Sequence, residues 1–159
     1  MSTRSNIGIL RKNGSVDVIY CHWDGYLQNN GDILLNYYKD NEKVNKLIEL
    51  GDISSLAINV EPTTKEHSYD TPEGNVTVAY GRDRGESNVD FRHFENLNDY
   101  LEQVDKLFIE YIYLYNEENG SWYYTDKTYD RLEDGKDLIW QDFELLTQEK
   151  IDEEGKDND

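Results

Sequence analysis

The sequence predicts an α+β fold in which an antiparallel sheet of about five strands carries about three to four helices. Three observations support this prediction. Two pairs of apolar, alternating segments each flank a turn that contains Asn and Gly, which is typical of a β-hairpin. A further alternating segment, residues 76–80, adds a fifth strand. Segments with apolar residues at helical spacing separate these strands.

The first hairpin is predicted over residues 6–12 and 15–21, with Asn13-Gly14 at its turn. Both turn residues tolerate a positive φ, which this turn requires. Two helices should follow. The first begins near Asp32, and Asn41 can cap the second.

A polar stretch over residues 61–74 holds both prolines and is the most mobile loop that we expect. Asn96 can cap a helix after the 76–80 strand. The second hairpin follows over residues 108–115 and 121–125.

Apolar spacing over residues 137–151 indicates a last helix. Residues 152–159 are almost entirely polar and acidic, which is typical of a disordered tail. The chain is therefore expected to form a single domain over residues 1–151 followed by that tail.

The charge of the chain is strongly negative and uneven. Sixteen Lys and Arg side chains stand against thirty-four Asp and Glu, a formal net charge of −18. Residues 1–60 carry six basic and seven acidic side chains, whereas residues 61–159 carry ten and twenty-seven. This potential repels nucleic acid and favours a partner with a basic surface. The alternative is that the acidity serves solubility alone.

Composition excludes several classes of protein and site. No apolar run approaches the ~20 residues of a membrane span, and residues 1–6 lack the apolar core of a secretion signal. The single cysteine, Cys21, excludes an intrachain disulfide framework and a CxxC zinc site, and it fits a reducing cytosol. We expect a cytoplasmic protein with no metal and no cofactor.

Residues 20–26, Tyr-Cys-His-Trp-Asp-Gly-Tyr, form the densest group of candidate functional residues. They lie where the second strand should end, so that His22 and Asp24 would point to the same side. Such a pair could act as a general base oriented by a carboxylate, or supply two metal ligands. Trp23 and Tyr26 could stack on a ligand or partner. The alternative is that Trp23 fills the core while His22 and Asp24 hydrogen-bond the turn.

Residues 80–86, Tyr-Gly-Arg-Asp-Arg-Gly-Glu, form a second group. On an extended segment Arg82 and Arg84 would project together, and paired guanidinium groups bind phosphate or carboxylate bidentately. The alternative is internal pairing of these arginines with nearby carboxylates, those of Asp83, Glu86 or Asp90.

The second hairpin offers a third group, which is aromatic. Tyr111, Tyr113 and Tyr115 share one side of its first strand with Ile109, which suits a strand with one partly wet face. Together with Trp122, Tyr111 and Tyr113 are candidates for contact with a partner or a free nucleotide. The alternative is ordinary cross-strand packing.

No common catalytic or nucleotide-binding motif occurs in the sequence, whether HExxH, P-loop, GxSxG, EF-hand loop or GxGxxG. The other two histidines, His67 and His93, are isolated in polar sequence.

Several of these stretches resemble a group of short hypothetical proteins of bacteriophages and other mobile elements. The resemblance covers roughly residues 3–125 and is carried by TRSNI (3–7), IYCHWDGY (19–26), AYGRDRGE (79–86) and the 111–124 hairpin. It implies a genetic setting and no catalytic assignment. Small acidic phage proteins often inhibit host defence proteins or host nucleic-acid enzymes, so the resemblance implies an inhibitor in the cytoplasm of a bacterial host.

Three functions follow from these observations. The first is an inhibitor or adaptor whose acidic surface occupies the basic, nucleic-acid-binding groove of a host protein. The second is a small enzyme or nucleotide-binding protein with His22, Asp24 and Glu86 as catalytic candidates and the two arginines as an anion clamp. The third is a structural role as a homodimer formed through the aromatic face. The first is favoured because the charge asymmetry extends over the whole chain, whereas a shared pocket needs contacts that a sequence does not show.

Overall fold

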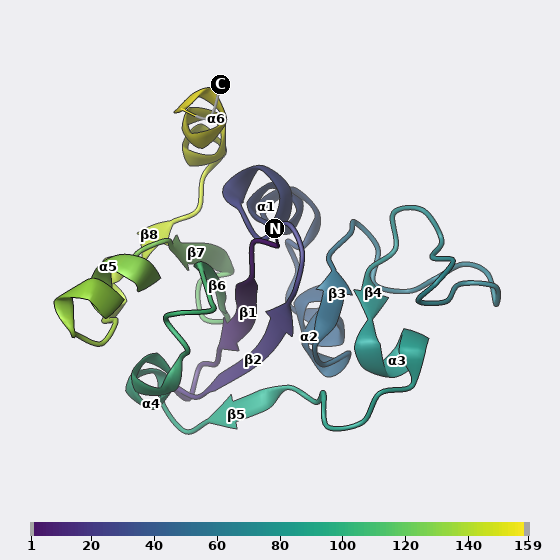
Figure 1. The fold of residues 1–159 in the computed structure, drawn as a ribbon, viewed down its shortest axis with the longest axis horizontal. Coiled ribbons are helices and arrows are strands. Elements are labelled where there is room, and N and C mark those ends of the chain that lie inside the picture. The colour runs from purple at the N-terminus through teal and green to yellow at the C-terminus, as the bar shows by residue number, and fades with distance from the viewer. Residues whose placement is uncertain (1, 158–159) are drawn as a thin grey trace.

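The computed structural model describes residues 2–157, and the predicted first hairpin lies at its centre (Figure 1). β1 (Ser5–Leu10) pairs antiparallel with β2 (Val16–Cys21). Gly14, in the turn between them, has a φ of 92°, which L side chains rarely adopt. The prediction of this hairpin is confirmed.

Around this hairpin the chain forms an eight-stranded mixed sheet, so the predicted five-stranded antiparallel sheet is wrong. The strands run in the order β4-β3-β2-β1-β6-β7-β8, and β5 pairs with β2. β1 pairs parallel with β6, and β2 pairs parallel with β3. The strands after the first hairpin are β3 (Ile53–Ser55), β4 (Val78–Ala79), β5 (Arg92–Phe94), β6 (Tyr111–Asn116), β7 (Ser121–Thr125) and β8 (Glu144–Leu145).

The short length of several strands and the pairing of β1 with β6 explain why the sequence did not predict the eight-stranded mixed sheet. β3 and β5 have three residues each and β8 has two, which is too short for an alternating pattern to be visible. The two hairpins join through β1 and β6, in a parallel register from Ser5 opposite Tyr111 to Leu10 opposite Asn116. Nothing inside either hairpin specifies which strand of the other it pairs with.

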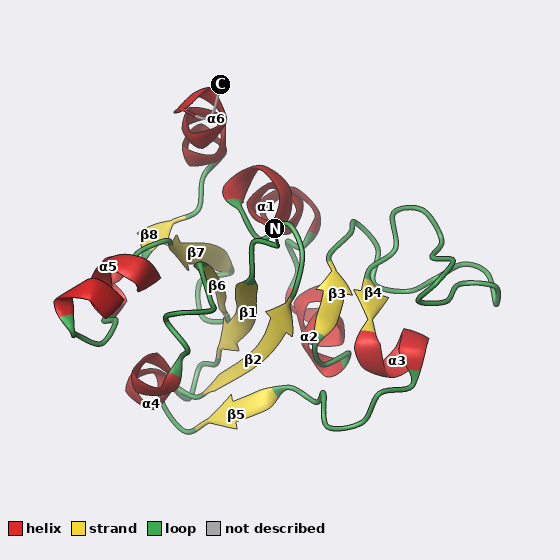
Figure 2. Ribbon diagram, viewed as in Figure 1, coloured by secondary structure: helices red, strands yellow, loops and turns green. Residues whose placement is uncertain are grey.

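Six α-helices accompany the sheet in the described residues, where about three to four were expected (Figure 2). The helices predicted near Asp32, Asn41 and Asn96 are present, and Asn96 caps its helix by accepting a hydrogen bond from the Asp99 amide at 2.9 Å. No helix of the described residues is long and apolar enough to cross a bilayer. The helices are α1 (Asp32–Tyr37), α2 (Asn41–Glu49), α3 (Tyr80–Arg84), α4 (Leu97–Gln103), α5 (Thr128–Asp134) and α6 (Gln148–Asp157).

The end of the chain differs most from the prediction. The predicted helix over residues 137–151 is wrong: a 3₁₀ turn at Trp140–Asp142 and β8 lie within this stretch, and α6 begins only at Gln148. α6 continues through residues 152–157, so the predicted disordered tail is also wrong there, while residues 158–159 lie outside the described part. Ile151 is 4% exposed and packs into the core, which anchors α6 to the rest of the chain.

The sheet is buried on both faces, because alternate residues of its central strands point into two separate cores. Ile7, Ile9 and Ile19 face the core that α1, α2 and α6 cover. Val18, Ile112 and Leu114 face the core beside α4, which the segment around Leu138 and Phe143 completes. Burial on both faces explains why the strand positions read as nearly continuous apolar runs.

The aromatic face of the second hairpin lies inside the first of these cores. Tyr113 is fully buried, and its hydroxyl donates to the Gly25 carbonyl at 2.6 Å. Trp122 is 3% exposed, and its indole N–H donates to the Tyr38 carbonyl at 2.9 Å. Their predicted role in contacting a partner is therefore wrong, because helices cover the face that the tyrosine pattern suggested was partly wet. Tyr111 is half-buried, and its hydroxyl donates to Glu154.

Candidate functional site

His22 follows β2 as predicted, but Asp24 does not orient it. The Nδ1 of His22 lies 2.7 Å from the Tyr20 hydroxyl, and the His22 ring packs edge-on against the Trp23 ring at a centroid distance of 4.6 Å. Asp24 has a φ of 56°, which turns the chain away from the strand direction. The predicted His–Asp pair is therefore wrong. Trp23 and Tyr26 are exposed at 43% and 36%, and their role in binding stays a prediction.

The 80–86 group forms the helix α3, so the two arginines do not project together from an extended segment. Arg82 donates to the carbonyls of Val60 and Thr77 at 2.6 and 2.7 Å and to the Asp83 carboxylate. Asp83 also accepts from the Ala79 amide at 2.8 Å. Hydrogen bonds to the Arg82 side chain hold the pKa of Asp83 below its usual value, although burial acts in the opposite direction. The internal alternative is the one that the geometry supports.

Arg84 anchors the 61–74 loop. Its guanidinium pairs with Glu86 and lies 4.5 and 4.9 Å from the ring centroids of Tyr69 and Tyr80. His67, also in this loop, contacts Asp83 through Nε2 at 3.0 Å. The stretch predicted to be the most mobile loop is thus tied to α3 at two points.

The structure does not bring the two sequence motifs into one pocket. Among the described residues, no contact joins His22 or Asp24 to Arg82, Arg84 or Glu86. The histidines that do meet carboxylates are the two that seemed isolated in the sequence, His67 with Asp83 and His93 with Asp17. These pairs depend on contacts between distant segments, and no local pattern indicates them.

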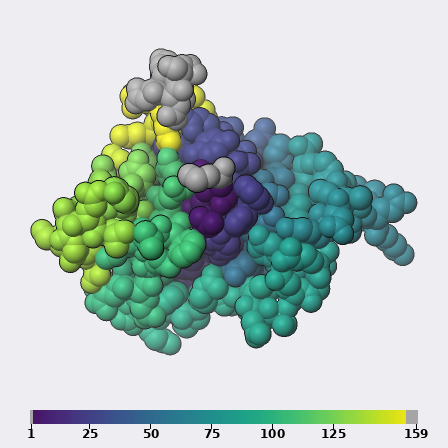
Figure 3. All heavy atoms as spheres, viewed as in Figure 1, coloured from purple at the N-terminus to yellow at the C-terminus, as the bar shows by residue number. Residues whose placement is uncertain are grey.

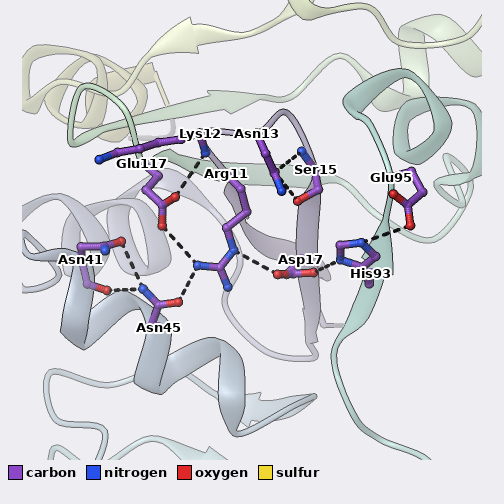
Figure 4. A network of polar contacts seen from close by, with 10 residues as sticks. All are labelled: Arg11, Lys12, Asn13, Ser15, Asp17, Asn41, Asn45, His93, Glu95 and Glu117. Atoms are coloured by element: carbon purple, nitrogen blue, oxygen red, sulfur yellow. Dashed lines mark hydrogen bonds and ion pairs between the residues drawn. The ribbon is translucent and has the colours of Figure 1, made fainter.

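A polar network connects the first hairpin to α2, β5 and the β6–β7 turn (Figure 4). Arg11 lies at its centre and donates to Asp17 at 3.0 Å, to Asn45 at 2.6 Å and to Glu117 at 3.3 Å. The other oxygen of Asp17 meets His93 Nδ1 at 2.6 Å, and this hydrogen bond raises the pKa of His93. Because these charges are satisfied inside the protein, we interpret the network as structural.

A groove of about 500 Å³ opens between β1, β2, β5, α4 and the loop before β6. Its size is within the range typical of small-molecule sites. Apolar and aromatic side chains line most of it, and several polar groups converge on it. The lining residues that carry the discussion below are Arg4, Asn6, Tyr20, Asp52, Arg92 and Phe108.

Two arginines face this groove. Arg92 pairs with Asp52 at 3.0 Å, and Asp52 also accepts the Tyr20 amide at 2.9 Å. This bond gives the Tyr20 backbone N–H a partner at the point of β2 that lies between its pairing with β5 and its pairing with β3. Arg4 lies 5.0 Å above the Phe108 ring and has no carboxylate within 4.0 Å among the described residues. In the part of the chain that the structure describes, it is a half-buried cation without an anionic partner, in a protein of net charge −18.

The surplus of acidic side chains lies in the C-terminal half. Residues 95–157 hold nineteen acidic and six basic side chains, whereas residues 2–94 hold fourteen and ten. α5, β8 and α6 lie along one side of the molecule, and the 61–74 loop projects at the opposite end (Figures 1 and 3). Residues 126–157, which include these three elements, hold twelve acidic and five basic side chains.

Many carboxylates of this side lack a cation. Asp137 pairs with Lys106, and Asp142 with Arg131. In contrast, several exposed carboxylates have no basic group within 4.0 Å among the described residues; on and beside α5 these are Asp126, Asp130 and Glu133.

Large apolar side chains are exposed beside these carboxylates. Tyr129 and Leu132 on α5 are exposed at 63% and 37%, and Ile139 after the helix at 51%. Leu107 is 73% exposed on a loop that Lys106 ties to the Lys136 carbonyl at 2.7 Å, so it lies near the segment after α5. Clustered exposed apolar groups rimmed by charge are typical of interaction surfaces.

The chain matches no protein-family model, no curated protein and no solved structure. The resemblance to short phage and mobile-element proteins thus stays a prediction. The groove and the acidic, partly apolar surface around α5 are the two features of the molecule from which a function can be inferred.

Proposed function

We propose that this protein binds a basic protein surface through α5 and the segments beside it. We call this surface the α5 face; its members are Asp126, Tyr129, Asp130, Leu132, Glu133 and Ile139. The observation that carries the proposal is that exposed apolar side chains stand next to carboxylates that have no cation partner among the described residues.

The order of residues in α5 puts the two kinds of group on adjacent stripes. Tyr129 and Leu132 are three residues apart and lie on one side of the helix, as do Asp130 and Glu133 beside them. A hydrogen bond to Glu133 raises the pKa of Tyr129, so the phenol and the carboxylate are in contact. A partner would therefore meet apolar surface and negative charge in one footprint.

The two stripes contribute at different stages of binding. Carboxylates attract a basic surface over a Debye length of about 8–10 Å and speed the encounter at low salt. Screened charge adds little affinity, so tight binding needs desolvated apolar contacts. Tyr129 and Ile139 supply these contacts in place of the buried Tyr113 and Trp122.

The partner class that we propose is a nucleic-acid-binding or defence protein of a bacterial host, met in the cytoplasm. Such proteins carry basic grooves that accept phosphates, and carboxylates at similar spacing offer the same sign of charge. Binding through the α5 face would block that groove. Direct binding of nucleic acid and homodimerisation through this face are both disfavoured by like-charge repulsion.

The test begins with capture from bacterial lysate at low salt, followed by titration of the purified captured protein. The double variant Asp130→Lys and Glu133→Lys should weaken binding at least tenfold and flatten its salt dependence, because the attraction becomes repulsion.

The matched control carries the same change of charge elsewhere. Glu49→Lys and Glu66→Lys alter two exposed carboxylates outside the C-terminal half and should leave the affinity within about threefold. Equal losses in both double variants would mean that only net charge matters, and capture of no basic protein would contradict the proposal outright.

A further inference from the structure

We infer that the groove beside β1 binds a small aromatic molecule carrying a single negative charge, held on a carboxylate or a phosphodiester. This inference is independent of the proposed function, because the groove and the α5 face are made of different residues. It rests on one cation, an apolar enclosure and one buried polar group.

The cation is Arg4. Its guanidinium stacks over Phe108 at 5.0 Å and hydrogen-bonds the Tyr20 side chain, which holds it over the groove and leaves its other donors for a ligand. Among the described residues it has no carboxylate partner within 4.0 Å. A guanidinium in this state offers a planar set of donors that matches the two oxygens of a carboxylate or a phosphodiester.

Tyr20 lies beside Arg4 and extends the polar end of the groove. Burial raises the pKa of Tyr20 while Arg4 acts against that rise, so the phenol stays protonated and close to the guanidinium. Its hydroxyl also meets His22 Nδ1 at 2.7 Å. An acidic group bound to Arg4 would thus have a phenol within reach.

The rest of the enclosure suits a ring. Phe94 and Phe108 line the groove together with Val18, Val104 and Ile109. A flat apolar or aromatic body would gain burial on both faces there, and aromatic pairs add attraction beyond the area that they bury.

Asn6 adds the polar group at the floor. It is 8% exposed, and its amide N–H donates to the Tyr100 hydroxyl at 2.7 Å. The Asn6 side chain lines the groove, where its amide oxygen can accept a hydrogen bond from an N–H or O–H donor on the ring of a ligand.

The charges around the groove favour one negative charge on the ligand over several. Arg92 is already paired with Asp52, and Asp105 accepts the amides of Leu107 and Phe108 at 3.1 and 3.3 Å. Arg4 is thus the one cation of the lining whose charge is not offset by a contact. A doubly charged ligand would leave one charge uncompensated in a strongly acidic protein.

The test uses amide NMR of the full-length protein at low salt with two probes, indoleacetate and cyclic AMP, which are aromatic monoanions. Adenosine lacks the charge, and dimethyl phosphate, which is also a monoanion, lacks the aromatic ring. At least one aromatic monoanion should shift the amides of Val18, Phe94 and Val104, with a dissociation constant below about 1 mM. Which of the two binds identifies the acidic group.

Variants of two arginines separate binding in the groove from a general effect of charge. Arg4→Gln should weaken probe binding about tenfold or more, since a charge-assisted hydrogen bond is lost, and Arg4→Lys should lose less. Arg84→Gln is the matched control, because Arg84 also stacks on aromatic rings but lies outside the groove, and it should change the affinity by less than about twofold.

Three results would overturn the inference: no groove shift with either probe, equal binding of adenosine or dimethyl phosphate, or equal losses in the Arg4 and Arg84 variants. Circular dichroism of each variant checks the fold. If Arg4→Gln proved unfolded, Arg4→Lys would carry the comparison.

Discussion

Aspartates of the N-terminal half and of the α5 face share one side chain but stand in opposite surroundings. Asp17 and Asp83 are almost buried, and each accepts hydrogen bonds from an arginine and meets a histidine. Asp126 and Asp130 are exposed and have no cation nearby among the described residues. The difference shows that a net charge of −18 has two separate parts, one that fixes the fold and one that is available for association.

The strongest test of this comparison removes the cation of a buried pair. Arg82→Met should lower the free energy of unfolding by roughly 3 kcal/mol, because it leaves the Asp83 carboxylate buried and strips two carbonyls of their donor. Urea unfolding measures the change. Arg84→Met, which breaks an exposed pair, should cost far less, and equal losses in the two variants would contradict the assignment of Asp83 to the fold.

The next test removes the apolar part of the α5 face. Tyr129→Ser with Ile139→Ser should weaken binding to the captured partner by about 2 kcal/mol, as expected when anchor side chains are truncated. The free energy of unfolding should stay within about 0.5 kcal/mol, since both side chains are exposed. A loss of stability as large as the loss of affinity would instead place these residues in the fold.

Salt should affect the two groups of carboxylates differently. Raising the ionic strength screens the repulsion among exposed acids and should raise the melting temperature by about 2 °C. Asp130→Asn with Glu133→Gln should reduce that response. Asp17→Asn should lower the melting temperature at every salt concentration, because its partners Arg11 and His93 lose a buried contact. A salt response unchanged by the α5 variant would argue against repulsion on that face.

What the sequence predicts correctly is local. Asn13-Gly14 specifies the first hairpin, and Asn96 caps α4, because each depends on residues within a few positions. The parallel pairing of β1 with β6 depends on segments about a hundred residues apart, and so does the burial of Tyr113 and Trp122. The alternating tyrosines of β6 indicate that these side chains share one face of the strand, but the sequence does not show which helices cover that face.

The candidate sites also depend on contacts between distant segments, which the sequence does not show. His22 and Trp23 were singled out by their density in the sequence, yet Arg4 and Arg92 form the groove, and they are brought together only by the pairing of β5 with β2. The α5 face was missed for another reason. α5 is a short helix without a strong apolar period, so Tyr129 and Ile139 gave no signal of an element that presents them.

The smallest expected effect concerns two histidines, His22 and His93, whose pKa values the structure shifts in opposite directions. The hydrogen bond from Asp17 raises the pKa of His93 above the ordinary value of 6.5, whereas burial, assisted by Arg4, lowers the pKa of His22 below it. NMR titration of the ring signals should place the two midpoints on either side of 6.5. Asp17→Asn should return His93 toward that value, and Arg4→Gln should raise the pKa of His22 without moving His93.

These shifts also set the sign of the pH dependence of stability. The contribution of His93 is complete below its unfolded-state pKa and is lost as the pH rises through its higher folded-state pKa. His22 acts in the opposite sense, because its neutral form is favoured in the folded state and stability is lost as the pH falls below 6.5. The two windows lie on either side of 6.5, so the contribution of the two histidines to the unfolding free energy should be greatest near pH 6.5 and fall at lower and at higher pH. His93→Gln should remove the fall above pH 6.5 and His22→Gln the fall below it, and identical pH profiles in the two variants would show that neither contact governs its histidine.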